Sequence, residues 1–343
     1  MTIDAKPPLG KYYEVGGRQL LLHQSGRGSP PVVFLAGAGT VGLDYLNVQR
    51  LAAEITTSVV YDRAGTGWSD RVELPRTSTQ VTDELRALLT AADVPGPYIL
   101  AGHSLGGLYA RHFAQRFPDE VAGLLLLDPA HEDWDKYMPR PPGEKRTARG
   151  PDRPRSDTDT STGSPLNSAK KHLYRMLGRA VAGAVRTALG RWLLLRLSAV
   201  QRIRELYRSL FAQEMTDWPE AIRELLIERH VSPIWLWTGV QESLNIDELY
   251  NEVRHAGPPP DVPLIVLCSM EVDPFRRAVS EGTSESRLRE EIDGKRRLYD
   301  ALVGSVPHGE NRLVDAGHLT IHYRHPGAVL QAMKYLLGSA RQR

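Results

Sequence analysis

Short apolar segments and amphipathic segments alternate along two parts of the chain. In the first part, the β-prone apolar runs cover residues 32–35, 58–61, 98–101 and 124–127. The segments with helical spacing between them cover residues 43–54, 82–92 and the small-residue stretch that ends at Phe117. Continuous apolar runs of this length are typical of strands covered on both faces, and strands that alternate with helices form parallel sheets. We therefore predict an α/β fold with a mostly parallel central sheet and crossover helices.

The same alternation returns near Pro263. The returning segments are a buried run at 264–267, a helix over 287–302 and a last strand over 311–314. At the start of the chain, β-prone runs at 12–15 and 19–23 flank the pair Gly16-Gly17. Two such runs joined by two glycines predict a hairpin at the beginning of the sheet.

Between Asp128 and Pro263 the alternation is interrupted, which predicts an insertion between two parts of one core. The predicted division is a first core part at 1–130, a helical cap at 131–260 and a second core part at 261–343. Within the insertion, residues 139–168 are rich in Pro, Gly, Ser and Thr and too polar to form a core, so we expect a mobile segment. Residues 169–250 are expected to form the cap helices.

One predicted cap helix, over 170–187, carries basic residues on one face and apolar residues on the other. Two interpretations follow. The favoured one is a helix that packs its apolar side onto the core and leaves a solvated basic face. The alternative is peripheral contact with an anionic membrane or an acidic substrate, because no Asp or Glu occurs between Thr160 and Arg204.

The overall charge is nearly balanced, with 43 Lys and Arg against 41 Asp and Glu. Composition therefore gives no argument for a nucleic-acid partner, and we expect a small-molecule substrate. The single cysteine, Cys268, excludes an internal disulfide framework. The amino-terminal segment has no apolar core of a signal peptide, which predicts a cytoplasmic protein, with peripheral membrane contact as the alternative.

The sequence Gly102-His103-Ser104-Leu105-Gly106 follows an apolar run and opens a helical stretch. A serine between two glycines at a strand-to-helix junction is typical of a nucleophile elbow, a sharp turn that exposes the hydroxyl. Glycines are needed there because neighbouring backbone comes too close for side chains. We predict Ser104 as a covalent nucleophile.

In four motifs, both flanks of the insertion resemble the α/β-hydrolase family. The motifs are Leu35-Ala36-Gly37-Ala38, Asp62-Arg63-Ala64-Gly65-Thr66-Gly67-Trp68-Ser69, Gly102-His103-Ser104-Leu105-Gly106-Gly107 and Asp315-Ala316-Gly317-His318. They occur in the order that this family has, which is more specific than any one of them. The resemblance covers roughly residues 10–135 and 260–338.

The resemblance implies a histidine base after the last strand, the place of His318. An imidazole there takes the serine proton and returns it to the leaving group near neutral pH. His322 stands four residues further on, as in a metal-binding pair, but no H-E-x-x-H signature or third ligand accompanies it, so no metal is expected. No organic cofactor is expected either.

Two carboxylates occupy places that the family uses for the acid that orients the histidine. Asp273 follows the penultimate strand, which is the commoner location, but about one residue late. Asp128 ends the strand after the elbow helix, a site used by haloalkane dehalogenases and some other members. Asp128 is slightly favoured, and Glu271 is a distant third. The two aspartates stay alternatives at this stage.

The family takes its oxyanion donors from the amide after the nucleophile, here Leu105, and from the loop after the first parallel strand, here Ala38. This chain has Ala36-Gly37 where the family usually has His-Gly. Asp62 and Arg63 match a pair that is mostly structural in the family, and we predict no catalytic role for them.

Together these features predict a serine hydrolase that cleaves an ester-like, fairly apolar substrate through an acyl-enzyme on Ser104. Thioesterase, lactonase, amidase, perhydrolase and lyase reactions use the same set of residues and stay open. The alternative from another class is a ligand-binding protein that keeps the fold without turnover, which the unusual Ala36-Gly37 loop suggests.

Overall fold

A computed structural model describes residues 6–139, 198–279 and 283–342 of the chain. The expected mobile segment beyond Pro139 and the basic helix at 170–187 lie outside these described residues.

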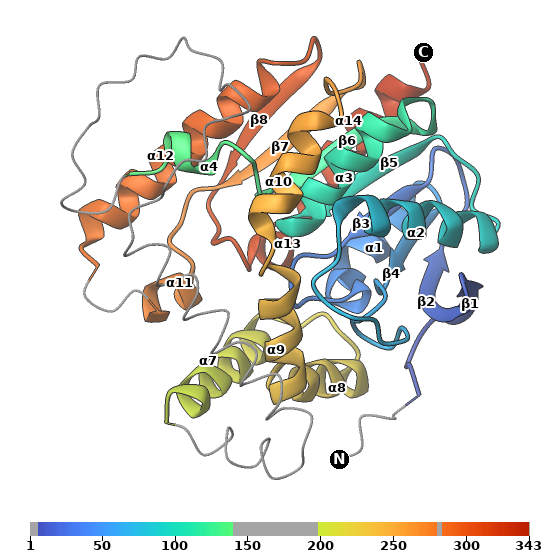
Figure 1. Ribbon diagram of the computed structural model, residues 1–343. Coiled ribbons are helices and arrows are strands. Elements are labelled where there is room, and N and C mark those ends of the chain that lie inside the picture. Colours follow the sequence, from blue (N-terminus) through green and yellow to red (C-terminus); the bar gives the residue numbers. More distant parts are fainter. Residues whose placement is uncertain (1–5, 140–197, 280–282, 343) are drawn as a thin grey trace.

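An eight-stranded sheet forms the centre of the molecule (Figure 1), in the order β1-β2-β4-β3-β5-β6-β7-β8. The strands are β1 (Lys11–Val15), β2 (Arg18–Ser25), β3 (Val32–Leu35), β4 (Ser58–Tyr61), β5 (Tyr98–His103), β6 (Val121–Leu127), β7 (Leu264–Ser269) and β8 (Gly309–Val314). β1 and β2 form the predicted hairpin, and β2 also pairs antiparallel with β4. All remaining pairs are parallel, so the prediction of a mostly parallel sheet is confirmed.

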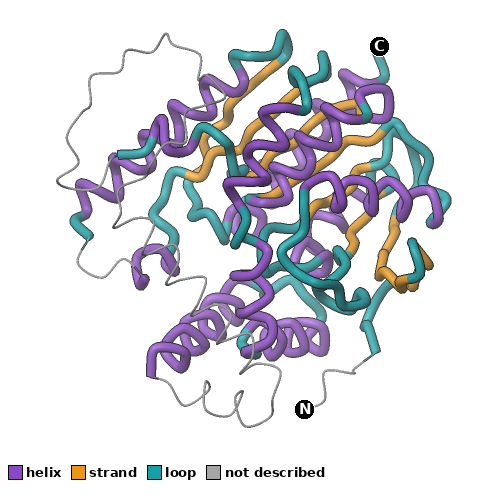
Figure 2. The backbone as a smooth tube through the Cα atoms, viewed as in Figure 1, coloured by secondary structure: helices purple, strands orange, loops and turns teal. Residues whose placement is uncertain are grey.

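Helices cover both faces of the sheet (Figure 2). The helices of the core are η1 (Gly42–Tyr45), α1 (Leu46–Ala53), α2 (Ser78–Ala91), α3 (Leu105–Arg116), η2 (Pro118–Glu120), α4 (Trp134–Tyr137), α11 (Pro274–Val279), α12 (Glu285–Val303), α13 (Ile321–Arg324) and α14 (Pro326–Ala340). On β3, Val33 and Leu35 pack with α2, α3 and α12, whereas Val32 and Phe34 pack with α1 and α14. Alternate side chains thus enter opposite layers, which is why the strands are apolar throughout.

Helix α2 begins at Ser78 rather than at the expected residue 82. Thr77 caps the helix by accepting a hydrogen bond from the N–H of Gln80, whose side chain in turn accepts from the N–H of Thr77. This reciprocal capping box satisfies amides that would otherwise be orphaned, and it extends the helix beyond its apolar stripe. Similarly, β8 begins at Gly309 rather than Asn311, because its pairing with β7 starts at Leu264.

After α4, four further described helices lie before β7: α7 (Ser198–Glu214), α8 (Glu220–His230), α9 (Pro233–Glu242) and α10 (Ile246–His255). The first three, which we call the cap helices, gather below the sheet in Figure 1. Their apolar side chains, among them Phe211, Leu226 and Trp235, join the hydrophobic cluster that contains Phe34. Helix α10 instead packs against α2 and α3, on the opposite layer.

Candidate active site

Ser104 lies at the sharp turn between β5 and α3. Its backbone has φ 52° and ψ −120°, a conformation that L residues rarely adopt. Two glycines allow the neighbouring backbone to pack closely around this turn. A Cβ on Gly102 would lie 2.5 Å from the carbonyl oxygen of Gly106, and a Cβ on Gly106 would lie 2.1 Å from the carbonyl oxygen of Leu35. The strained turn projects the serine hydroxyl beyond the end of the sheet, as the elbow motif predicts.

A chain of hydrogen bonds connects Ser104, His318 and Asp128. The Nε2 atom of His318 lies 3.0 Å from the Oγ of Ser104, and its Nδ1 lies 2.6 Å from the Oδ2 of Asp128. A carboxylate only accepts hydrogen bonds, so Nδ1 carries the proton of the neutral imidazole and donates it to Asp128. Nε2 is then free to accept the hydroxyl proton of Ser104.

Asp128 is buried, and its carboxylate accepts a hydrogen bond from a lysine as well as from His318. The Nζ of Lys295, on α12, lies 3.0 Å from Oδ2 of Asp128 and 2.5 Å from the Oγ of Ser269. The N–H of Ser269 donates to Oδ1. Burial alone would raise the pKa of Asp128, but the charge of Lys295 and the hydrogen bond from His318 hold it well below its ordinary value. Asp128 is therefore a permanent anion at neutral pH.

Asp273 does not contact the imidazole. Its Oδ2 accepts from the N–H of Leu319 at 2.7 Å, and its Oδ1 accepts from the N–H of Phe275 at 2.8 Å. This carboxylate therefore holds the backbone next to His318 instead of its ring. Glu271, the third candidate, is exposed and lies 3.7 Å from Arg324. Of the predicted acids, the structure brings only Asp128 to the ring of His318.

A second histidine, His103, precedes Ser104 in the chain and connects the segment of His318 to Tyr45. The Nε2 of His103 lies 2.9 Å from the carbonyl oxygen of His318, and its Nδ1 lies 2.7 Å from the hydroxyl of Tyr45. Burial lowers the pKa of His103 to about 3, so the ring is neutral. Because a carbonyl only accepts, Nε2 is the donor and Nδ1 accepts from Tyr45. The Tyr45 oxygen in turn accepts from the N–H of Gly37 at 3.2 Å.

The predicted oxyanion donors lie on either side of Ser104. The loop 36–40, which we call the oxyanion loop, passes so close that a Cβ on Gly37 would lie 3.3 Å from the Cβ of Ser104. Leu105 is the first residue of α3, where a backbone N–H has no partner within the helix. No acceptor among the described residues takes the N–H of Ala38 or of Leu105. Two such amides beside a nucleophile can bind a developing oxyanion.

The other residues singled out from the sequence, His322 and Asp62, make contacts that stabilise the local structure. His322 is buried and stacks on Tyr45 with ring centroids 4.4 Å apart. Asp62 accepts from the N–H groups of Gly42 and Trp68 and so shapes the loop after β4. Among residues 6–139, 198–279 and 283–342, no three His, Cys, Asp or Glu side chains are arranged to hold a metal ion.

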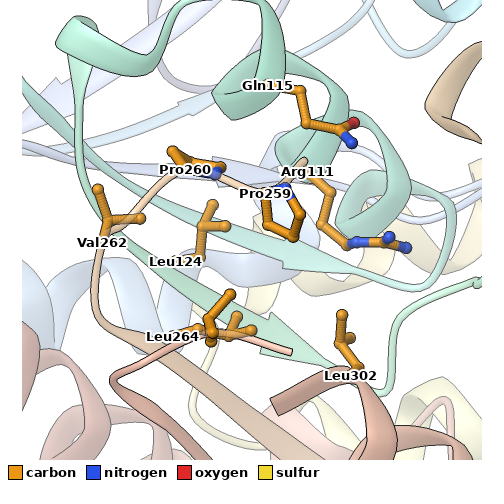
Figure 3. A pocket seen from close by; sticks show the side chains of 9 residues that line it. Arg111, Gln115, Leu124, Pro259, Pro260, Val262, Leu264 and Leu302 are labelled. Atoms are coloured by element: carbon orange, nitrogen blue, oxygen red, sulfur yellow. The ribbon is translucent and has the colours of Figure 1, made fainter. Parts of the chain in front are cut away.

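An apolar cavity lies elsewhere, between the middle of β6 and the amino end of β7 (Figure 3). Its lining includes Leu124, Pro259 and Leu264, and its volume is about 10 Å³. Roughly 10–15 Å³ is needed for one water molecule. This cavity is too small for an organic substrate, and it lies away from the carboxyl ends of the strands, where Ser104 and Asp128 are placed.

Comparison with known proteins shows the family of the chain. The sequence profile of the alpha/beta hydrolase family matches residues 32–332. The chain belongs to this family. The resemblance inferred from the four motifs is thereby confirmed for the fold and for the hydrolase family.

Among curated proteins, the chain is 37% identical over 118 residues to the uncharacterised protein YqjL of Bacillus subtilis. It is 38% identical over 103 residues to the (lyso)-N-acylphosphatidylethanolamine lipase of Homo sapiens. These alignments cover 34% and 29% of this chain, and 46% and 30% of the relatives. The chain therefore spans less than half the length of each of these two relatives.

Among solved structures, an enol-lactonase from Burkholderia xenovorans matches with a TM-score of 0.57 and 16% identity, over 95% of this chain and 99% of that one. An esterase from Thermogutta terrifontis matches with a TM-score of 0.55 and 18% identity, over 98% and 99%. At such identities the likeness shows the fold alone. None of the described helices combines the length and the apolar character that a bilayer-spanning helix needs.

Proposed function

We propose that the protein is a serine hydrolase that cleaves an ester-like, fairly apolar small molecule through an acyl-enzyme on Ser104. The observation that carries the proposal is the hydrogen-bonded chain from Ser104 through His318 to Asp128, with Oγ to Nε2 at 3.0 Å and Nδ1 to Oδ2 at 2.6 Å. The lactonase, esterase and lipase among its relatives support the same class of acyl chemistry.

In the proposed reaction, Oγ of Ser104 attacks the substrate carbonyl carbon while its proton passes to Nε2 of His318. The N–H groups of Ala38 and Leu105 bind the oxyanion of the tetrahedral intermediate. As the bond to the leaving group breaks, His318 returns the proton to the departing alcohol. A water molecule, deprotonated by His318, then attacks the acyl carbon, and the intermediate collapses to the acid and free Ser104. Asp128 remains ionised and stabilises the imidazolium at both steps.

The proposal is tested with p-nitrophenyl esters of different acyl length and with a fluorophosphonate probe that labels activated serines. We expect the wild type to hydrolyse at least the short or medium esters and to take the label. Ser104→Ala is expected to lose the label and to lower kcat by about 10⁴-fold or more. A wild type that takes no label would favour the ligand-binding alternative, and undiminished turnover by Ser104→Ala would refute the proposal.

A further inference from the structure

The amides of the oxyanion loop are paired on both sides of Ala38. The N–H of Gly37 donates to the hydroxyl of Tyr45 at 3.2 Å, and the N–H of Gly39 donates to the Oε2 of Glu242 at 2.8 Å. The N–H of Thr40 turns back to the carbonyl oxygen of Gly37 at 3.3 Å. Among the backbone N–H groups of residues 37–40, these contacts leave that of Ala38 without an acceptor in the described part of the chain.

The direction of that donor is set by the peptide unit between Gly37 and Ala38. A trans peptide is planar, so its N–H points opposite to its C=O. The C=O of Gly37 accepts from NH2 of Arg63 at 2.8 Å and from Oγ1 of Thr40 at 3.1 Å. Arg63 also donates through NH1 to the carbonyl oxygen of Ala36 at 2.5 Å. By holding the carbonyl end, Arg63 fixes the orientation of the Ala38 N–H at the other end.

Arg63 is itself held by the cap helix α9. Its Nε and NH2 donate to Oε1 of Glu242 at 3.0 and 2.7 Å, and the two side chains are only 3% and 5% exposed. A buried guanidinium without a partner is costly, so the position of Arg63 depends on the carboxylate. One carboxylate oxygen of Glu242 accepts from Arg63, and the other accepts from the N–H of Gly39. Glu242 therefore holds the oxyanion loop directly at Gly39 and, through Arg63, at Gly37.

Two further contacts bind the same helix to the same loop. The indole Nε1 of Trp235 donates to the carbonyl oxygen of Gly39 at 2.6 Å. Gly239 comes so close that a Cβ on it would lie 3.0 Å from the Cα of Gly39. The oxyanion loop and α9 are thus packed as one unit, although they lie about two hundred residues apart in the chain.

We propose that Glu242 is a positioning residue, which orients the Ala38 oxyanion donor through Arg63 and so makes the oxyanion hole depend on the docked cap. The inference rests on the proposed function of Ser104. In this arrangement the cap helix α9 packs on the core and also determines the orientation of one N–H group that binds the oxyanion in the transition state. It also gives Arg63, which the sequence marked only as structural, a defined part in orienting the donor.

The test compares substitutions of Glu242 by ester hydrolysis and by hydrogen exchange of the segment 36–41. Glu242→Gln removes the charge and one acceptor. Glu242→Asp keeps the cation neutralised, which protects the fold, but is too short to reach both Arg63 and Gly39. We expect both variants to lower kcat by about 10- to 100-fold with KM changed by less than about threefold, since the oxyanion forms only in the transition state. Exchange in 36–41 is expected to accelerate.

Glu214→Gln is the matched control. Glu214 is a largely buried acid of the cap helix α7, and it accepts from Nε of Arg324 in the core at 2.8 Å, without contact to the oxyanion loop. We expect this variant to keep kcat within about twofold and the 36–41 exchange unchanged. The inference is overturned if the Glu242 variants keep wild-type kcat, or lose no more than the control does. A wild type without Ser104-dependent turnover overturns the proposed function, and the inference with it.

Discussion

Asp128 and Asp273 end strands or follow them at the same edge of the sheet, and they contact the His318 segment in different ways. Asp128 accepts from the imidazole ring, whereas Asp273 accepts from the backbone N–H of Leu319. A carboxylate that accepts a hydrogen bond from the imidazole ring fixes its tautomer and stabilises the imidazolium. A carboxylate that accepts only from the neighbouring backbone positions the loop. At the scale of single residues, these two roles have different consequences for the rate.

We therefore expect Asp128→Asn to lower kcat by about 10³- to 10⁴-fold, because an amide on Nδ1 no longer enforces the productive tautomer. Asp273→Asn, the matched substitution, keeps one acceptor oxygen for the backbone and is expected to lower kcat by about tenfold or less. Both are measured by steady-state hydrolysis of the preferred p-nitrophenyl ester. A larger loss for Asp273→Asn would assign the acid role to Asp273.

Lys295 sets the pH range over which Asp128 is ionised. Lys295→Met removes the cation that lowers the pKa of Asp128, and burial then raises that pKa. A carboxylate with a raised pKa takes up its proton at a higher pH, so activity is lost earlier on acidification. We expect the acidic limb of the kcat/KM profile to move to higher pH in Lys295→Met than in the wild type.

The control for this shift is Arg289→Met on the same helix α12. Arg289 is 75% exposed and lies 3.9 Å from Glu285, its one ion pair among the described residues, so the profile is expected to stay at its wild-type position. An unchanged profile in Lys295→Met would contradict the role of Lys295.

At the scale of elements, the packing of α3 against β3 depends on a helix residue without a side chain. A Cβ on Gly106 would lie 2.1 Å from the carbonyl oxygen of Leu35 and 2.6 Å from that of Ala36. Both atoms belong to backbone, which cannot move aside without displacing β3 or the oxyanion loop. The elbow therefore joins three elements at one point, namely β3, β5 and α3.

We expect Gly106→Ala to lower the free energy of unfolding by about 1–3 kcal/mol through overpacking. Gly338→Ala in α14 is the matched control, because nothing lies within 4 Å of its added Cβ. Alanine there is expected to stabilise the helix by about 0.5–1 kcal/mol. Urea unfolding followed by circular dichroism measures both changes. A Gly106→Ala variant as stable as the wild type would show that the close approach is not required.

At the scale of the whole molecule, the cap helices and the sheet share one apolar cluster. Phe211, Met215 and Leu226 of the cap pack in the cluster that holds Val32 and Phe34 of β3. Polar contacts add to this, since His230 of α8 lies 2.8 Å from Asp44 and both are buried. Such a shared core is typical of elements that unfold together.

We therefore expect the amides of α8 and those of β5 to lose protection at the same urea concentration, measured by hydrogen exchange with mass spectrometry at rising urea. The physical reason is that opening the cap alone would expose the apolar side chains of α8 and the cap-facing side of the sheet. Loss of protection in α8 at urea concentrations where β5 stays protected would contradict a single cooperative unit.

Much of the fold follows from local patterns. The continuous apolar runs predicted the strands of the parallel sheet, and the glycines around Ser104 predicted the turn between β5 and α3. These features are local in sequence, and the chemistry of a few neighbouring residues decides them. The boundaries of α2 and β8 were displaced, because a capping box and a strand partner set them instead of apolar periodicity.

Long-range contacts decided the rest. The sequence offered Asp128 and Asp273 as alternatives, and only the fold decides which one reaches the ring of His318. Lys295 lies on the apolar stripe of α12 with Leu288 and Leu302, and a charged residue in that register was the available signal for a buried partner.

What the chain determined by itself is the set of reactive groups and the strand and helix ends that carry them, since these depend on residue type and short spacing. What only the tertiary structure decided is which of these groups touch: Asp128 with Lys295, His103 with the carbonyl of His318, and Glu242 with Arg63. The reason is physical. Hydrogen bonds and ion pairs act over about 3 Å, and residues hundreds of positions apart reach that separation only after the apolar core has brought their elements together.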